Sequence, residues 1–260
     1  FANLNDKQIE AVKAIDGPVL ILAGAGSGKT KALTHRIAYL IAQGVKSENI
    51  LSITFTNKAA GEIKERVEKL ISILSDNQRP STSPPYMGTF HSICLRILRH
   101  DIEQLGYTNN FIIYDDDDQL QLIKRVMEDL EISVKKFNPK SMLGKISKLK
   151  SELVDYHEYA QIAKEYSDKI TSDIYNSYQV SLKRNNAVDF DDLIMLCVNL
   201  FQKKPEILEK YQEIFKYILI DEYQDTNHAQ YVWVNLLAKK HRNLFVIGDD
   251  YQAIYAWRQA

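Results

Sequence analysis

The hydrophobic and polar positions of the chain follow two different periods, and the change between them divides the sequence into three parts. Short apolar runs typical of buried strands lie near both ends, and several are followed by apolar residues at helical spacing. The runs are 19–22, 50–55, 86–89, 217–221 and 244–248. This alternation predicts an α/β fold with a parallel sheet, in which ligands bind at the carboxyl ends of the strands.

Between about residues 93 and 187 the helical period dominates, and 111–114 is the only strand candidate. We therefore expect a mostly helical insert at 93–187, between a first part of the α/β domain at 1–92 and a second part at 188–260. The helices that we expect are 4–12, 31–42, 58–74, one beginning near 91, 119–130, 139–149, 157–166, 170–184, 189–201, 205–215 and 230–240.

Composition narrows the class of protein. Of the 260 residues, 45% are hydrophobic and 26% are charged, as in ordinary soluble domains. No apolar run approaches the ~20 residues that a membrane span needs, and no signal-peptide pattern occurs. We therefore expect a cytoplasmic protein. The sequence starts without Met, which suggests a trimmed chain. Cys94 and Cys197 lie in apolar helical contexts, which predicts buried thiols in a reducing compartment. With a net charge of −1, any nucleic-acid binding must come from a local groove and from stacking.

Four consecutive aspartates at 115–118 precede the helical segment that begins at Gln119. Carboxylates at a helix start accept hydrogen bonds from free backbone N–H groups and interact favourably with the helix dipole. We interpret the run as a helix cap, and a metal site is the alternative.

The segment 23–30 has the composition of a phosphate-binding loop, because it joins a buried strand to a helix and ends Gly-Lys-Thr. Glycines let successive N–H groups point at phosphate oxygens, and the helix N-terminus adds free donors. Lys29 would reach the β- and γ-phosphates, and Thr30 would ligate Mg²⁺. The alternative is a glycine-rich turn with no ligand. The expected nucleotide contacts are Ala23, Gly24, Ala25, Gly26, Ser27, Gly28, Lys29 and Thr30, with Ala23 at a position where the strict pattern has Gly.

A second group of polar residues follows the late apolar runs. Asp221 and Glu222 come directly after the run at 217–220, where Asp221 would hold Mg²⁺ and Glu222 would deprotonate the attacking water. Gln252 follows the next run, and its amide would sense the γ-phosphate. The alternatives are solvated acidic residues at a strand end and a solvated glutamine in a loop.

In this order, these segments resemble the N-terminal half of a superfamily 1 DNA helicase of the UvrD/PcrA/Rep type. The resemblance covers essentially the whole chain. It rests on 4–8 (Q motif), 23–30 (motif I), 54–60 (motif Ia), 88–92 (motif Ib), 189–193, 221–226 (motif II) and 248–260 (motif III). It implies a RecA-like ATPase domain, called 1A, with the helical insert as domain 1B, and it implies that Gln8 contacts adenine.

The resemblance also implies a track for single-stranded DNA. The matching positions are the aromatic Phe55, Phe190, Tyr255 and Trp257, with Asn57, Thr89, His91 and Arg258 as polar neighbours. Stacking on aromatic rings suits a motor that must accept any base sequence. Without the resemblance, the aromatic residues would be interpreted as core and His91 as a cap or a solvated side chain. Gln259 stands where the family has Gly, so the backbone path beyond Arg258 is not carried over.

The activity implied by the resemblance is ATP-dependent 3′ to 5′ movement on single-stranded DNA and at junctions with duplex, using Mg·ATP, with repair or replication proteins as partners. Family motifs IV to VI, which belong to a second RecA-like domain, lie beyond Ala260. Their arginines can contribute ~10³–10⁵ in rate, so we expect the 260-residue piece alone to bind Mg·ATP weakly and to hydrolyse it poorly. The alternatives are the motor of a helicase–nuclease, an ATP-gated single-strand binding switch, and an ATPase that acts on proteins or small molecules.

Overall fold

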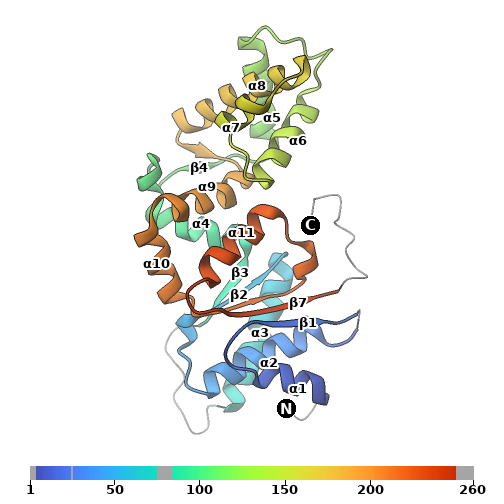
Figure 1. Ribbon diagram of the computed structural model, residues 1–260, viewed down its shortest axis with the longest axis vertical. Coiled ribbons are helices and arrows are strands. Elements are labelled where there is room, and N and C mark those ends of the chain that lie inside the picture. Colours follow the sequence, from blue (N-terminus) through green and yellow to red (C-terminus); the bar gives the residue numbers. More distant parts are fainter. Residues whose placement is uncertain (1–3, 25, 75–83, 250–260) are drawn as a thin grey trace. The chain divides into compact units, whose positions relative to one another are not determined.

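The structure is a computed structural model that describes residues 4–24, 26–74 and 84–249 (Figure 1). The chain forms two compact units, which are described separately. Within the described residues, the first unit consists of 4–93, 205–226 and 234–249, and the second of 94–204 and 227–233. No helix among the residues described is long and apolar enough to cross a membrane.

The first unit is built on a five-stranded sheet in which every pair of neighbouring strands is parallel. The strand order is β1-β7-β6-β2-β3. The strands are β1 (Val19–Leu22), β2 (Ile50–Thr54), β3 (Tyr86–Thr89), β6 (Tyr217–Ile220) and β7 (Asn243–Gly248). The parallel α/β sheet expected from the sequence is therefore confirmed, and all its carboxyl ends lie at one edge.

Helices α1 (Asp6–Lys13), α2 (Lys29–Ala42) and α3 (Asn57–Leu74) lie together on one side of this sheet (Figure 1). Apolar residues of α2 and α3 form a buried cluster with the strands, against which Ala11 of α1 packs. The cluster consists of Leu33, Ile37, Leu40, Ile50, Ile63, Val67, Leu219, Phe245 and Ile247. The first unit also contains η1 (Ser47–Asn49), α10 (Pro205–Ile214) and η3 (Tyr223–Asp225). Helix α2 begins two residues earlier than the periodicity predicts, because Lys29 and Thr30 already have helical backbone.

The second unit is mostly helical, as expected. Its elements are η2 (Ile102–Leu105), β4 (Ile112–Ile113), α5 (Asp116–Asp129), α6 (Pro139–Ser151), α7 (Tyr156–Ile162), α8 (Tyr166–Arg184), β5 (Ala187–Val188) and α9 (Phe190–Lys203). Helices α4 (Phe90–Asp101) and α11 (His228–Ala238) are divided between the two units. Strand β5 pairs in parallel with β4 and was missed by the sequence analysis, because two apolar residues carry no periodicity.

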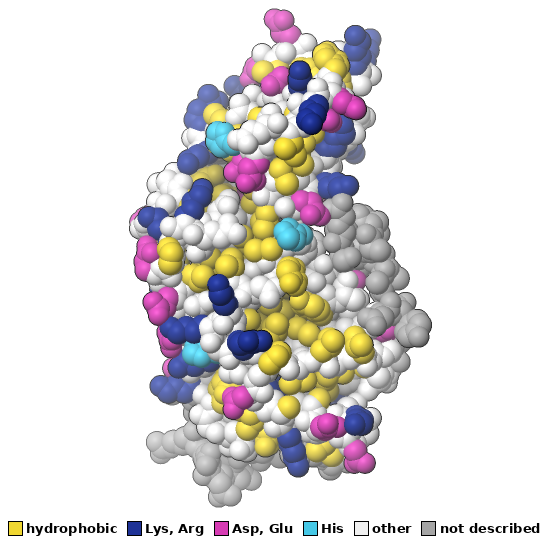
Figure 2. All heavy atoms as spheres, viewed as in Figure 1, with side chains coloured by type: hydrophobic (Ala, Val, Ile, Leu, Met, Phe, Trp, Pro, Cys, Tyr) yellow, Lys and Arg dark blue, Asp and Glu magenta, His cyan; other side chains and the backbone are white. Residues whose placement is uncertain are grey.

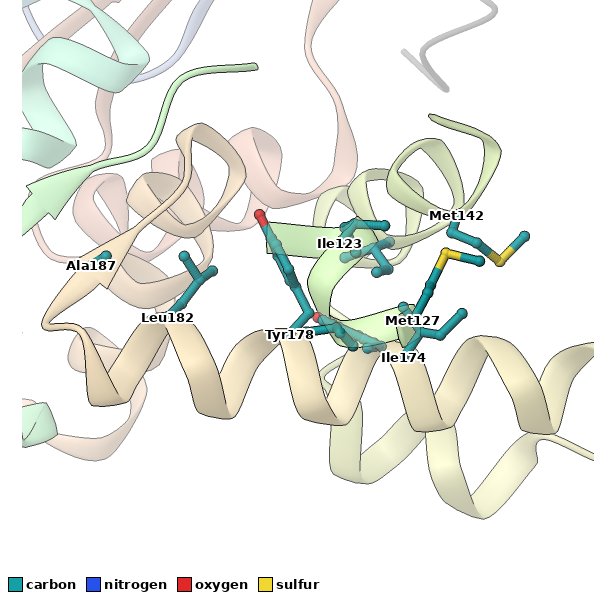
Figure 3. Close-up of a cluster of buried hydrophobic side chains, with 10 residues drawn as sticks. Ile123, Met127, Met142, Ile174, Tyr178, Leu182 and Ala187 are labelled. Atoms are coloured by element: carbon teal, nitrogen blue, oxygen red, sulfur yellow. The ribbon is translucent and has the colours of Figure 1, made fainter. Parts of the chain in front are cut away.

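The core of the second unit lies between α5, α6 and α8 (Figure 3). Ile123 and Met127 from α5, Met142 from α6 and Tyr178 from α8 pack together there. Cys94 and Cys197 are buried free thiols, as expected. The aspartate run is a helix cap: Asp115 accepts hydrogen bonds from the N–H groups of Asp117 and Asp118, and α5 follows directly.

The two compact units do not test the expected domain boundaries, which stay a prediction. The second unit begins at Cys94, and the insert is expected from residue 93. The first unit resumes at Pro205, and the return to the α/β domain is expected at residue 188. Helix α9 stays in the second unit because its first turn is tied to α6 and α8 by buried polar contacts.

Candidate nucleotide-binding site

The phosphate loop, residues 23–30, begins where β1 ends, and it leads directly into α2. Its first N–H, that of Ala23, donates to the carbonyl of Gly248 at 3.0 Å, which places the loop beside the end of β7. Gly26 and Gly28 have φ angles of 72° and 82°, in the left-handed region that favours glycine. At Gly28 a Cβ would also lie 2.9 Å from Gln8 Nε2, so a larger residue would collide with it. Ala25 lies outside the described residues.

Asp221 follows β6 and is 4% exposed. Burial, and then the neighbouring charge of Glu222, raise its pKa to about 6, while Lys29 and a hydrogen bond from Thr30 act in the opposite direction. The structure therefore brings the Thr30 hydroxyl and the Asp221 carboxyl group into contact. Hydroxyl and carboxylate oxygens are the ligands that Mg²⁺ prefers, and Mg²⁺ binds through few protein groups because it keeps several waters. This donor set fits the magnesium ion that the sequence predicts.

Lys29 contacts two carboxylates from neighbouring strand ends. Its Nζ lies 3.4 Å from Glu222 Oε2 and 3.4 Å from Asp249 Oδ2. Asp249 had no role assigned from the sequence, although the strand order places the residue after β7 beside the residues after β1 and β6. The position after a buried strand was the signal that could have found it. Negative charge already surrounds Lys29, so an incoming phosphate must compete with these carboxylates for the ammonium group.

Glu222 has an unusual backbone. Its φ is 52°, which is uncommon for a residue other than glycine, and its N–H donates to Asp221 Oδ1 at 3.0 Å. Strained backbone of this kind is concentrated at functional sites, where surrounding contacts hold it. The turn aims the Glu222 side chain toward Lys29 while Asp221 is directed toward Thr30. Two adjacent carboxylates thereby have different partners.

Gln8 lies against the phosphate loop. Its Nε2 donates to the carbonyl of Ser27 at 2.8 Å, and its Oε1 accepts from the N–H of Asn5, the cap of α1. Both polar ends of the amide are therefore engaged within the chain, and contact with adenine stays a prediction. Arg36 of α2 fixes the other end of α1 by donating to the carbonyls of Val12 and Ile15. Burial lowers the pKa of Arg36 to about 10, so it is still charged at neutral pH.

The residues expected to contact DNA occupy different surroundings. In the first unit the Phe55 ring packs edge-on against Phe90 at 5.6 Å, and His91 is half-buried in the first turn of α4. Thr89 is 9% exposed and its hydroxyl accepts from the N–H of Ser92, so it caps α4. Asn57 is exposed at the start of α3. In the second unit Phe190 is 46% exposed, unusual for a large apolar residue. The positions Gln252, Tyr255, Trp257 and Arg258 lie outside the described residues.

Comparison with known proteins gives one consistent result. Residues 4–260 match the family described as UvrD/REP helicase N-terminal domain. The ATP-dependent DNA helicase PcrA of Bacillus subtilis is 51% identical over 100% of this chain and 34% of its own length. The PcrA proteins of Staphylococcus aureus and Staphylococcus epidermidis are 51% and 50% identical over 99% of the chain. The chain thus spans about a third of the length of these relatives. With its phosphate loop and strand-end carboxylates at one edge of a parallel sheet, this chain belongs to the family of UvrD/REP helicase N-terminal domains.

Proposed function

We propose that this chain is the N-terminal ATP-binding part of a longer ATP-dependent DNA helicase. The observation that carries the proposal is the meeting of Lys29, Thr30, Asp221 and Glu222 at the carboxyl edge of the sheet. These residues come from two segments about 190 positions apart in the sequence, and together they provide a phosphate-binding cation, two candidate magnesium ligands and a candidate base. The names of the Bacillus and Staphylococcus relatives support the same activity.

In this proposal each residue has one task in ATP hydrolysis. The loop N–H groups and Lys29 bind the phosphates and stabilise the charge that develops during transfer. Glu222 accepts the proton of the attacking water. Mg²⁺, held by Thr30 and Asp221, would neutralise phosphate charge when bound. Lys29 would leave Glu222 as it engages the phosphates, which frees the carboxylate for that water.

The first unit then corresponds to domain 1A and the helical insert to domain 1B, with the 188–260 boundary proposed from the resemblance. A second RecA-like domain of the same protein would complete the ATP site. Single-stranded DNA would stack on the exposed Phe190 ring and on the other track positions, with 3′ to 5′ movement. On the face seen in Figure 2, Lys and Arg side chains are interspersed with Asp and Glu. Charge alone therefore does not mark a DNA surface on that face. We also propose a cytosolic location and repair or replication partners.

The test of ATP hydrolysis is the ATPase rate of the full-length protein with and without single-stranded DNA. We expect DNA to stimulate turnover, and we expect Glu222→Gln to abolish turnover while ATP binding is retained, because the amide cannot accept the proton. Glu152→Gln, a partly exposed position after α6, is the matched control. A DNA-independent rate, or normal turnover in Glu222→Gln, would contradict the proposal. The 260-residue piece alone should hydrolyse ATP poorly.

The test of the DNA track compares two exposed apolar residues of the second unit. Phe190→Ala should weaken single-stranded DNA binding by about 5- to 100-fold, since base–aromatic stacking contributes ~1–3 kcal/mol. Val180→Ala, at a residue 52% exposed, should leave the affinity within about twofold. Fluorescence anisotropy with a labelled oligonucleotide measures both. If the two substitutions had equal effects on DNA affinity, Phe190 would not be part of the proposed DNA track.

A further inference from the structure

Gln224 lies in the short helix η3 that follows Glu222, and its amide makes two contacts. Its Nε2 donates to Glu222 Oε2 at 2.8 Å, and its Oε1 accepts from the N–H of Asp249 at 2.9 Å. One side chain therefore connects the residues that follow two neighbouring strands, β6 and β7. The sequence analysis assigned Gln224 no individual role.

The chemistry of the two contacts requires an amide. A carboxylate such as Glu222 only accepts hydrogen bonds, and a backbone N–H only donates. A glutamine supplies one donor and one acceptor on the same planar group, so it satisfies both partners at once. A glutamate at this position could still accept from Asp249, but it would place a second negative charge against Glu222.

The amide is also held closely against β7. A Cβ on Gly248 would lie 3.1 Å from Gln224 Oε1, tighter than ordinary van der Waals contact. Glycine at the last position of β7 therefore leaves room for this approach. Glu222 is 35% exposed, so its carboxylate can change rotamer unless a neighbouring group holds it. Gln224 provides that contact on Oε2, the same oxygen that lies 3.4 Å from Lys29 Nζ.

We propose that Gln224 is a positioning residue for ATP hydrolysis, which holds the Glu222 carboxylate in place and links it to the end of β7. This inference rests on the proposed function, in which Glu222 is the base. When Lys29 leaves Glu222 for the phosphates, the bond from Gln224 keeps the carboxylate in position. Movement of the residues after β7 would also be transmitted to Glu222 through the same amide.

The experiment measures ATP turnover and nucleotide affinity in the full-length protein. Gln224→Met keeps the length of the side chain and removes both hydrogen bonds, so kcat should fall by about 10- to 100-fold, the loss expected for a hydrogen bond to a charged group. The dissociation constant for ADP should change by less than twofold, because Gln224 is not expected to contact the nucleotide. Gln43→Met, at an exposed glutamine after α2, is the matched control and should behave as wild type.

Two further variants separate positioning of Glu222 from a merely structural link. Gln224→Glu preserves an acceptor for Asp249, so it should restore activity if only that link matters, and it should be at least as slow as Gln224→Met if Glu222 is the target. In a Glu222→Gln background, Gln224→Met should lower the residual single-turnover rate no further, since residues that act through one group are not additive. Wild-type kcat in Gln224→Met or Gln224→Glu, or a full additional loss in the double variant, would overturn the inference. A wild-type protein without DNA-stimulated ATPase would instead contradict the proposed function, and this inference with it.

Discussion

Two lysines of this chain each hold a pair of carboxylates, but their surroundings differ. In the second unit, Lys150 Nζ lies 2.6 Å from Asp189 Oδ2 and 2.8 Å from Asp192 Oδ1, and its side chain is fully buried. In the first unit, Lys29 Nζ lies 3.4 Å from each of its two carboxylate oxygens, and one partner, Glu222, is 35% exposed.

The Lys150 cluster is closed by further hydrogen bonds. The Tyr178 hydroxyl donates to Asp189 at 3.0 Å, and the Gln179 amide donates to both oxygens of Asp192 at 3.1 Å. Burial by itself would lower the pKa of Lys150, but the two carboxylates raise it above the ordinary lysine value, so the lysine is charged. A buried charge is tolerated only with such partners. The buried cluster therefore links α6, α8 and α9 to one another.

The Lys29 cluster has the same charges with longer contacts, and water reaches it mainly at Glu222, since Lys29 and Asp249 are 9% and 1% exposed. Attraction between charges weakens with distance and with solvent screening, so Lys29 can exchange a carboxylate for a phosphate at small cost. Under the proposed function, tight and buried pairing would mark a structural lysine, and looser pairing at a strand edge would mark a phosphate-binding one. Substitutions at the two lysines, and at a partly buried aspartate near Lys150, separate these two kinds of cluster.

Lys150→Met should destabilise the second unit by about 3–5 kcal/mol, because it leaves two buried carboxylates without their cation. Hydrogen exchange of the amides in α6 and α9 of the full-length protein measures the local opening free energy. Amides of β2 and β6 in the first unit serve as the internal control and should be unaffected. A decrease of less than about 1 kcal/mol in this opening free energy would show that the Lys150 cluster does not hold α6 and α9 together.

Lys29→Met should have a large effect on ATP turnover and a smaller effect on local stability than Lys150→Met. Turnover of ATP should fall by about 10²–10³-fold, the usual loss on removing one group that stabilises developing charge. The opening free energy of β6 and β7 should fall by less than the loss in Lys150→Met, because the Lys29 contacts are longer and one of its partners, Glu222, is 35% exposed. Steady-state ATPase assays and hydrogen exchange on the same variant check both parts. If Lys29→Met destabilised the protein as much as Lys150→Met, the two lysine clusters would not differ in structural role.

Asp191→Asn should have the smallest effect and should depend on pH. Burial, and then the charge of Asp189, raise the pKa of Asp191 to about 6. The folded state thus binds this proton more tightly than the unfolded chain, so its contribution makes the protein less stable as pH rises from about 4 to about 6. The variant should lose this dependence, a difference of up to roughly 3 kcal/mol at neutral pH. Urea midpoints at pH 4.5 and pH 7 measure it, and parallel pH curves for the two proteins would refute it.

Most of the fold followed from local patterns. The five strands of the main sheet were each found from an apolar run, and Asn5 and Asp115 act as helix caps as their residue types predict. The missed strand has a local cause as well. Strand β5 is too short to show a period.

The candidate site was predicted in part. The phosphate loop, Asp221 and Glu222 were identified because their spacing and their position after apolar runs are local features. Asp249 and Gln224 gained roles only from the structure, since single polar residues at strand ends are common. Thr89, expected beside DNA, has a hydroxyl that is engaged in capping α4.

Local sequence patterns were enough to predict the parallel α/β architecture, the helical insert and the phosphate loop, because hydrophobic period and glycine-rich turns act over a few residues. Which charges meet depends on the three-dimensional arrangement of the strands. The order β1-β7-β6-β2-β3 brings residues 29, 222 and 249 to one edge, although they are far apart in the chain. The tertiary structure also decided that Lys150 is buried and Lys29 is not fully enclosed. In the sequence, Lys150 and Lys29 are each simply a lysine in a helix. How deeply each side chain is buried depends on elements that are distant in the chain, and this burial distinguishes the structural lysine from the proposed phosphate-binding one.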